Sequence, residues 1–277
     1  MPQTSKADTP ADYSRVSEAP GIRVTREALS MLRTRYEFAS RFCGDKDVLE
    51  VGCGAGMGLR HLARNARRVV GGDYAEVMLR SAKKHGVPGM ALVRLDAQRL
   101  PFQESSFDVV LLFEAIYYLP QPVAFVEECR RVLRENGTLL VCSANKECPG
   151  FGASEFSHAY FSADELRKLL EENDFVAQAY GAFPAAPRTS SGKAKATVRE
   201  LAVRWNLIPK TMRGKELLKR VFYGRLTELG TSIEEHMAPY APPSLLQPNE
   251  ASNYKVIYVV GRRGRNGARN CDAHQES

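Results

Sequence analysis

Four residues at alternate positions, Glu50, Gly52, Gly54 and Gly56, form the pattern in the sequence that is best suited to hold a cofactor. Glycine is needed where the backbone must adopt a positive φ, or where a ligand approaches the main chain closely. A helix that starts after such a turn presents free N–H groups and the positive end of its dipole, which favour a carboxylate or a phosphate. These residue types at this spacing indicate a binding loop for a nucleotide-type cofactor.

The spacing of the glycines decides between cofactor classes. A dinucleotide-binding loop has the pattern Gly-x-Gly-x-x-Gly. Counting from Gly52 or from Gly54, the third glycine position holds Met57 or Leu59. The loop also lacks the Gly-Lys-Ser/Thr ending that binds nucleoside triphosphates. A nicotinamide dehydrogenase is therefore the weakest interpretation of this loop.

Two acidic residues stand at the ends of the next two expected strands. Residues 68–72 form an apolar run that leads to Asp73, and residues 91–95 form one that leads to Asp96. A carboxylate at the end of such a strand can accept both ribose hydroxyls of an adenosine. Asp73 could also cap the helix expected over 75–85, and the two roles do not exclude each other. Tyr74 is a candidate to lie against an adenine ring.

The glycine loop, the two acids and the apolar strand over 106–114 resemble, in order and spacing, class I S-adenosylmethionine-dependent methyltransferases of type 11. The resemblance covers residues 40–182 and a last strand near 254–260. It implies that S-adenosylmethionine is the cofactor, that Asp96 caps the adenine amino group, and that Tyr36 closes over the methionine part. The cofactor-binding residues expected on this basis are Tyr36, Glu50, Gly52, Cys53, Gly54, Gly56, Asp73, Tyr74, Asp96, Ala97 and Phe113.

The elements that must position these residues follow an α/β pattern. Apolar runs alternate with amphipathic segments, and the resemblance implies a doubly wound, Rossmann-like sheet of seven strands whose last strand is antiparallel. Helices are expected from Thr25, over 59–66 and 75–85, up to residue 133, and from Ser162, which forms a capping box with Glu165. The expected strands cover residues 47–51, 68–74, 91–95, 106–114, 138–141 after a turn at 134–137, 175–183 and 253–260.

The domain boundaries follow from composition. We expect a disordered lead-in at 1–20, a methyltransferase domain at 21–183 and 251–261, a basic helical insertion at 184–250, and a disordered tail at 262–277. Residues 188–225 carry eleven Lys or Arg and two acids, a balance of +9, whereas the whole chain has +7. Two helices are expected in this insertion, near 197–205 and 214–227. They form either a solvated cap or a lid that attracts a phosphate-bearing acceptor, an anionic membrane or a nucleic acid.

The catalytic group is less clearly marked than the cofactor loop. Methyl transfer from a sulfonium is a direct displacement, and a hydroxyl acceptor must also lose its proton. The Asn/Asp-Pro-Pro-Tyr/Phe motif used on amide or base nitrogens is replaced by residues 113–116, which disfavours such acceptors. His158 and Glu114 are the candidate bases, with His236 behind them. The resemblance implies that Glu114 more often shapes the cofactor pocket.

The resemblance is strongest to bacterial enzymes of surface-polysaccharide and other small-molecule pathways. It implies O-methylation of a sugar or glycan precursor, with an acceptor that carries a phosphate or a lipid. Two alternatives stay open: an RNA methyltransferase that uses the basic insertion, although no RNA-binding module is recognisable, and a non-catalytic cofactor-binding scaffold for a partner enzyme. The oligomeric state is not indicated.

The remaining sequence features are those of an ordinary soluble protein. The chain has 277 residues, of which 44% are hydrophobic and 26% charged. No secretory signal or membrane-spanning run is recognisable, and we expect a cytoplasmic location. The six cysteines contain no Cys-x-x-Cys pair, so reduced thiols are expected and a metal site is not.

Overall fold

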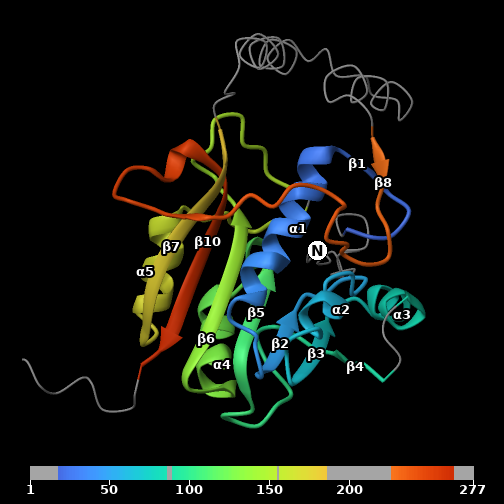
Figure 1. Cartoon of the computed structure of the whole chain (residues 1–277). Helices are drawn as coiled ribbons and strands as arrows, with labels where there is room; N and C mark the ends of the chain where they lie inside the picture. The colour runs from blue at the N-terminus through green and yellow to red at the C-terminus, as the bar shows by residue number, and fades with distance from the viewer. Residues whose placement is uncertain (1–17, 86–88, 155, 186–225, 265–277) are drawn as a thin grey trace, which may run out of the picture.

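A computed structural model of the chain describes residues 18–85, 89–154, 156–185 and 226–264. At its centre lies a mixed sheet with the strand order β4-β3-β2-β5-β6-β10-β7-β9 (Figure 1). Five neighbouring strands are parallel: β4 (Ala91–Arg94), β3 (Arg68–Asp73), β2 (Asp47–Val51), β5 (Phe107–Phe113) and β6 (Leu133–Ala144). The last strand, β10 (Tyr254–Arg263), runs antiparallel between β6 and β7 (Phe175–Pro184). The expected Rossmann-like sheet with an antiparallel last strand is thus confirmed.

Three short strands add to the seven that the sequence predicts. β9 (Ser244–Leu245) pairs with the edge strand β7 and makes the sheet eight-stranded. β1 (Arg23–Val24) and β8 (Thr227–Glu228) form a separate antiparallel ribbon. This ribbon pairs the segment that precedes α1 with a segment that lies far away in the sequence, near residue 228.

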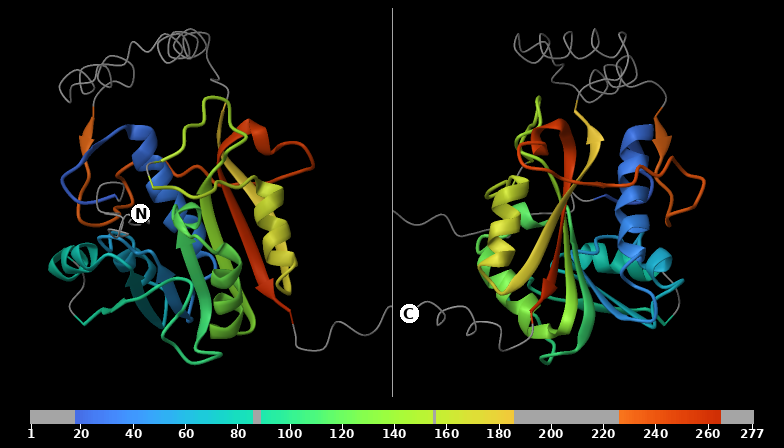
Figure 2. Two further views of the ribbon diagram at one scale, coloured as in Figure 1. Left: turned by 180° about the vertical axis from the view of Figure 1, so that it is seen from behind. Right: turned by 60° about the vertical axis from the view of Figure 1, so that its left-hand side comes forward.

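Helices cover both faces of the sheet (Figure 2). One face packs against α1 (Arg26–Ser40), α2 (Leu59–Leu62) and α3 (Glu76–His85), and the other against α4 (Pro122–Val132) and α5 (Ala163–Glu171). Because both faces of the central strands are covered, these strands are mostly apolar, and in β5 every residue except Asp108 is buried. The 3₁₀ turns are η2 (Ile116–Tyr118) and η3 (Ala251–Asn253).

The helix starts follow the expected capping chemistry. Thr25 Oγ1 accepts a hydrogen bond from the N–H of Ala28 at the start of α1. Ser162 and Glu165 form both bonds of a capping box at the start of α5. These bonds satisfy N–H groups that a helix cannot pair internally.

Several predicted boundaries differ from the structure. The helix expected over 59–66 ends at Leu62, and the following turn brings the chain to β3. The turn expected at 134–137 belongs to β6, where Asn136 adopts a φ of 60° near a register shift. β10 continues to Arg263, two residues past the predicted end of the domain.

The basic insertion is described only at its two ends. The helix predicted near 197–205 and residues 214–225 of the other lie outside the described residues, and Thr227 is part of β8. The end after residue 225 packs on the domain, because Leu229, Ile233 and Ala238 are buried in the same core cluster as α1.

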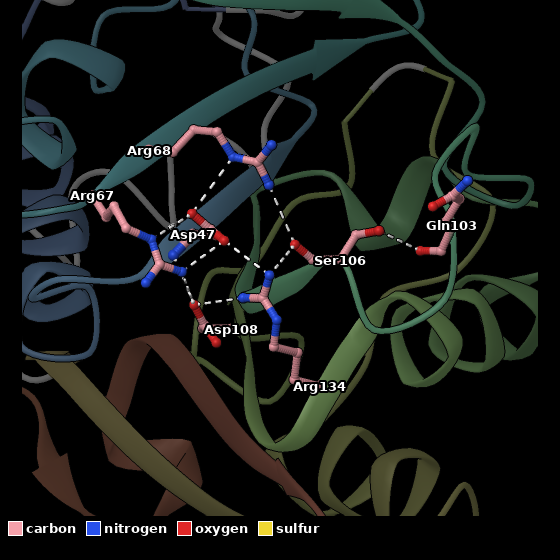
Figure 3. Close-up of polar contacts among 7 residues, drawn as sticks. All are labelled: Asp47, Arg67, Arg68, Gln103, Ser106, Asp108 and Arg134. Atoms are coloured by element: carbon pink, nitrogen blue, oxygen red, sulfur yellow. Dashed lines mark hydrogen bonds and ion pairs between the residues drawn. The ribbon is translucent and has the colours of Figure 1, made fainter.

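An arginine–aspartate network holds the amino ends of four adjacent strands (Figure 3). Asp47 on β2 is paired with Arg67 at 2.7 Å and with Arg134 on β6 at 2.9 Å. Asp108 on β5 is paired with Arg134 at 2.8 Å. The network lies at the amino ends of these strands and so leaves their carboxyl ends for a ligand site.

Candidate functional site

A cavity of about 640 Å³ lies at the carboxyl ends of β2, β3 and β5, a size typical of small-molecule sites. It forms where the parallel strands end, as expected for a doubly wound sheet. Eleven of the thirteen site residues predicted from the sequence line it: Tyr36, Glu50, Gly52, Cys53, Gly54, Asp73, Tyr74, Asp96, Ala97, Phe113 and Glu114. Gly56 and His158 are not among the lining residues.

The glycine loop is shaped by positive φ angles and by one half-buried carboxylate, that of Asp73. Gly54 adopts a φ of 55°, and its N–H donates to Asp73 Oδ2 at 2.8 Å. Gly56 faces α3 instead of the cavity: a Cβ there would lie 2.9 Å from the Cβ of Ala82. Gly56 therefore allows the loop to pack closely on α3. The sequence pattern alone does not distinguish a glycine needed for packing from one needed for ligand contact.

Asp73 keeps acceptor capacity for a ligand. Oδ2 accepts from the N–H of Gly54, Oδ1 accepts from the N–H of Ala75 at 2.8 Å, and the N–H of Tyr74 also bonds to the carboxylate. A carboxylate has about four lone-pair sites, so it can still accept from a ligand hydroxyl. Burial raises the pKa of Asp73 above its ordinary value, against the effect of these bonds. Tyr74, next to it, is 49% exposed at the edge of the cavity.

Glu50 and Tyr36 form a buried pair. The hydroxyl of Tyr36 donates to Glu50 Oε1 at 2.5 Å, whereas Glu50 Oε2 is buried with no partner among the described residues. Burial raises the pKa of Glu50 to about 8. Tyr36 lies against Gly58, where an added Cβ would be 1.8 Å from its ring. A buried acceptor without a protein donor fits a ligand that brings a donor of its own.

Glu114 occupies an unusual backbone position at the end of β5. Its φ is 50°, in the left-handed region that residues other than glycine rarely adopt and that is often found at functional sites. Glu114 Oε2 accepts from the hydroxyl of Tyr117 at 3.0 Å and from the N–H of Ala144 at 3.1 Å. Burial raises its pKa above the ordinary value. The ring of Tyr117 stacks on Tyr160 with centroids 4.2 Å apart.

Arg35 lines the cavity but belongs to none of the sequence motifs that predict the site. It is 6% exposed and pairs with Glu18, which also lines the cavity. The signal was present in the helix spacing, because Arg35 lies three residues after Leu32 and four before Ala39, both buried. A charged residue on the apolar stripe of a helix requires a partner, and this one faces a cavity.

His158 is placed differently from the sequence expectation. Its side chain is exposed, and its backbone N–H donates to the carbonyl oxygen of Tyr117 at 2.7 Å. Nothing in the structure brings the imidazole to the cavity, so its role as a base stays a prediction without a supporting contact. His236 lines a different hollow, beside α1.

Comparison with known proteins decides the family. A methyltransferase domain family matches residues 49–141, which include the glycine loop and both acids. A probable S-adenosylmethionine-dependent methyltransferase of Mycobacterium tuberculosis is 31% identical over 190 residues, which cover 64% of this chain and 69% of that protein. The chain belongs to the class I S-adenosylmethionine-dependent methyltransferases. It is an enzyme, and S-adenosylmethionine is its cofactor.

Other relatives of this methyltransferase match over shorter stretches. A probable S-adenosylmethionine-dependent methyltransferase of Mycolicibacterium smegmatis is 36% identical over 156 residues, covering 54% of this chain and 60% of that protein. A phthiotriol/phenolphthiotriol dimycocerosates methyltransferase of Mycobacterium tuberculosis is 43% identical over 97 residues, covering 34% and 36%. The last match is confined to a part of each chain, so it carries no statement about the whole protein.

Solved structures confirm the fold of the methyltransferase. A possible histamine N-methyltransferase from Thermotoga maritima aligns with a TM-score of 0.56 and 15% identity, over 86% of this chain and 91% of that one. The [4+2]-cyclase SpnF aligns with a TM-score of 0.53 and 16% identity, over 90% and 87%. Because the same fold carries such different reactions, the acceptor must be argued from the site.

Two further features of the methyltransferase concern membranes and metals. None of its described helices combines the length and apolar character needed to cross a bilayer. Within the described ranges, no cluster of three or more His, Cys, Asp or Glu is arranged to hold a metal ion.

Proposed function

We propose that this methyltransferase transfers a methyl group from S-adenosylmethionine to a hydroxyl group of a small molecule, and that the acceptor is a sugar or glycan precursor. The observation that carries the first part is Glu114. It is a half-buried carboxylate held in a left-handed backbone conformation at the end of β5, and desolvation raises its pKa. Such a group is suited to take up the proton that a hydroxyl loses.

The cofactor half of the cavity is assigned by the donors and acceptors that it offers. Asp73 accepts bonds from backbone N–H groups and keeps acceptor capacity for the ribose hydroxyls. Asp96 lines the cavity next to buried Ala97, at the end where the adenine is expected. Glu50 Oε2 lacks a protein donor and suits the ammonium group of the methionine part. These three assignments remain proposals of ours.

For this methyl transfer the protein has to position the acceptor and remove one proton. S-adenosylmethionine, when bound, supplies a methyl group that is activated by the sulfonium charge. Glu114 accepts the hydroxyl proton of the acceptor, and Tyr117 orients the carboxylate through the hydrogen bond to Oε2. The N–H of Ala144 holds the same oxygen and limits its rotation. Both bonds favour the ionised form of Glu114, which is the form that can act as a base.

The lining of the acceptor half supports a sugar or a lipid-linked sugar. Tyr118 lines the cavity and offers aromatic surface on which the C–H face of a sugar can pack. Met31 and Val256 add apolar surface to the lining, and Lys255, which is paired with Glu27 at 2.6 Å, also lines it. Polysaccharide biosynthesis is the pathway that we propose on this basis.

The two alternatives from the sequence stand differently. The RNA methyltransferase interpretation depends on the basic residues 188–225, which lie outside the described residues. Contact of the same segment with an anionic membrane, and the cytoplasmic location, likewise stay predictions. The scaffold interpretation is disfavoured by membership in an enzyme family.

A Glu114→Gln variant tests the assignment of the base. Extract of the source cell provides the acceptor, and labelled S-adenosylmethionine reports turnover. We expect turnover to fall about 100-fold or more, as for the loss of a general base, while calorimetry shows cofactor affinity within about threefold of the wild type. His158→Ala is the matched control and should keep its turnover. Normal turnover in Glu114→Gln would refute the role of Glu114, and loss of turnover in His158→Ala alone would transfer the role to His158.

A further inference from the structure

An aromatic stack supports the tyrosine whose hydroxyl bonds to Glu114. The ring of Tyr117 in η2 stacks on the ring of Tyr160, with centroids 4.2 Å apart and planes inclined by 19°. Tyr117 is buried and lines the cavity, whereas Tyr160 is half-buried and is not among the lining residues. Any effect of Tyr160 on the chemistry in the cavity must therefore pass through Tyr117.

The loop that follows β6 carries Tyr160 and holds its ring from two sides. The N–H of Ser154 donates to the hydroxyl oxygen of Tyr160 at 3.1 Å. The ring of Phe151 meets that of Tyr160 edge to face, with centroids 4.6 Å apart. The loop is also tied to η2 through the backbone, because the N–H of His158 donates to the carbonyl oxygen of Tyr117 at 2.7 Å. Tyr160 is therefore a fixed surface against which Tyr117 packs.

The second tyrosine of η2 strengthens the same attachment. The hydroxyl of Tyr118 and Oγ of Ser154 share a hydrogen bond of 2.7 Å. The ring of Tyr118 meets that of Tyr117 at a centroid distance of 4.6 Å and an angle of 63°. Ser154 thus holds Tyr160 with its N–H and Tyr118 with its side chain. The loop and η2 are joined into one aromatic unit around Tyr117.

This unit fixes the place of the Tyr117 hydroxyl. The hydroxyl stands at the end of a long, rigid side chain, so a small rotation at χ1 moves it away from Glu114. The face of Tyr160 blocks rotation in one direction, and rotation in the other direction loses the stacking contact. The distance of 3.0 Å between the Tyr117 hydroxyl and Glu114 Oε2 therefore depends on Tyr160.

The hydrogen bond that is held in this way acts on the proton affinity of Glu114. Burial raises the pKa of Glu114, whereas Arg35 of α1 and the hydrogen bond from Tyr117 lower it. Loss of that hydrogen bond would leave burial less opposed, and the pKa of Glu114 would rise further. The other titratable groups that interact with this carboxylate are Glu18, Tyr118, Cys142 of β6, Tyr160 and Tyr258 of β10.

We propose that Tyr160 is a positioning residue of the methyltransferase, which holds the Tyr117 hydroxyl on Glu114 by stacking on the Tyr117 ring. It acts through Tyr117 and not through contact with the cofactor or the acceptor. The inference rests on the proposed function, because Glu114 is the proposed base. The loop after β6 then contributes to catalysis, although none of its described residues between 150 and 161 lines the cavity.

The experiment measures the pKa of Glu114 and the pH dependence of turnover in the same full-length proteins. Nuclear magnetic resonance of protein with carbon-13 in the glutamate carboxyl groups gives the pKa, and the Glu114 signal is the one missing from Glu114→Gln. Turnover is measured with labelled S-adenosylmethionine and extract of the source cell as the source of acceptor. Calorimetry with S-adenosylhomocysteine verifies that the cofactor site is intact.

Four variants separate the stack from the hydroxyl groups. Tyr160→Leu removes the stack, Tyr160→Phe keeps it, and Tyr117→Phe removes the hydroxyl that bonds to Glu114. Tyr180→Leu is the matched control, because the half-buried ring of Tyr180 also contacts another aromatic ring, but lies on β7 and does not line the cavity.

We expect Tyr160→Leu to behave like a weaker form of Tyr117→Phe. In both variants the pKa of Glu114 should rise, because the ionised carboxylate loses a donor. The rise of turnover with pH should move to higher pH in parallel. In Tyr160→Leu, turnover on the plateau should fall about two- to tenfold, the size of one stacked aromatic pair. Tyr160→Phe and Tyr180→Leu should keep the wild-type pKa of Glu114, and cofactor affinity should stay within about twofold in all four.

Two outcomes would overturn the proposal. If Tyr117→Phe raises the pKa of Glu114 and Tyr160→Leu does not, the hydroxyl keeps its place without the stack. If Tyr160→Phe raises the pKa as much as Tyr160→Leu, the bond to Ser154 matters and the ring face does not. A raised pKa without a displaced pH dependence of turnover would support the role of Tyr160 and refute Glu114 as the base.

A milder variant keeps the test decisive if Tyr160→Leu does not fold. Phe151→Leu removes the edge contact that holds the ring of Tyr160 and leaves both tyrosines in place. The pKa of Glu114 should rise in this variant too, by less than in Tyr117→Phe. An unchanged pKa in folded Phe151→Leu would contradict the proposal.

Discussion

Replacement of Asp73 by asparagine tests the cofactor half of the site most sharply. The carboxylate of Asp73 holds the N–H groups of Gly54 and Ala75, one on each oxygen, both at 2.8 Å. The N–H of Tyr74 also bonds to this carboxylate, and the ribose hydroxyls would use its remaining acceptor capacity. Asparagine has the same shape but only one accepting oxygen, so it must lose at least one backbone bond and one ribose bond.

The expected magnitude follows from this count of bonds. A hydrogen bond to a charged acceptor contributes about 1.5 to 3 kcal/mol. The loss of one ribose bond, together with a loosened glycine loop, should cost about 2 to 3 kcal/mol of binding free energy. This corresponds to an affinity about 30- to 150-fold lower.

Calorimetric titration with S-adenosylhomocysteine, which cannot be turned over, measures this loss. Asp108→Asn is the matched control, since Asp108 lies in the arginine network at the amino end of the sheet and should leave affinity unchanged (Figure 3). Burial raises the pKa of Asp73, so the affinity of the wild type should also fall on acidification at a higher pH than for an exposed aspartate. A folded Asp73→Asn protein with an affinity within about threefold of the wild type would refute the ribose assignment.

Three further predictions concern the base, the packing of Tyr36 and the arginine network. Because burial raises the pKa of Glu114, kcat/KM should rise with pH through an ionisation whose pKa lies above the ordinary glutamate value of about 4.3. If the pH profile of Glu114→Gln shows the same rise, the assignment of Glu114 as the base is wrong. Gly58→Ala places a Cβ 1.8 Å from the ring of Tyr36, so the ring must move and release Glu50. Denaturant unfolding should therefore show a free energy of unfolding that is lower by about 2 kcal/mol or more. An unchanged unfolding midpoint would show that the ring adjusts in place. Asp47 has a pKa lowered to about 2 by Arg67 and Arg134, so the ionised carboxylate stabilises the fold above pH 4 and loses this effect as the pH falls through about 2. Asp47→Asn should lower the free energy of unfolding by about 1 to 2 kcal/mol at neutral pH, a value reduced for the solvent screening of the exposed arginines. A loss of the same size at pH 2 would argue against an electrostatic origin.

The fold and the cofactor loop could be predicted because they depend on local patterns. The positive φ angles of Gly52 and Gly54 require a residue without a Cβ, and the buried β5 requires a continuous apolar run, so both are visible in the sequence. Gly56 shows the limit of such a reading. The same residue type lines the cavity at Gly54 and packs on Ala82 at Gly56.

The acceptor half could be predicted only in part, because its geometry depends on long-range packing. Glu114 was visible as the residue that ends an apolar strand, but its left-handed backbone and its bonds to Tyr117 and Ala144 arise from η2 and β6. Arg35 meets Glu18 across 17 positions of sequence, in a segment that no motif marks. His158 stands close to Tyr117 in the fold through its backbone, and sequence spacing does not reveal that its ring is exposed.

The acceptor atom is the central claim, and one measurement tests it directly. The enzyme is incubated with extract of the source cell and with S-adenosylmethionine that carries a labelled methyl group, and the labelled product is purified and its bonding determined by nuclear magnetic resonance. The account predicts a methyl ether on a sugar hydroxyl, formed by the wild type and lost in Glu114→Gln. A methyl group on nitrogen or carbon, or label that nuclease releases from RNA, would contradict it.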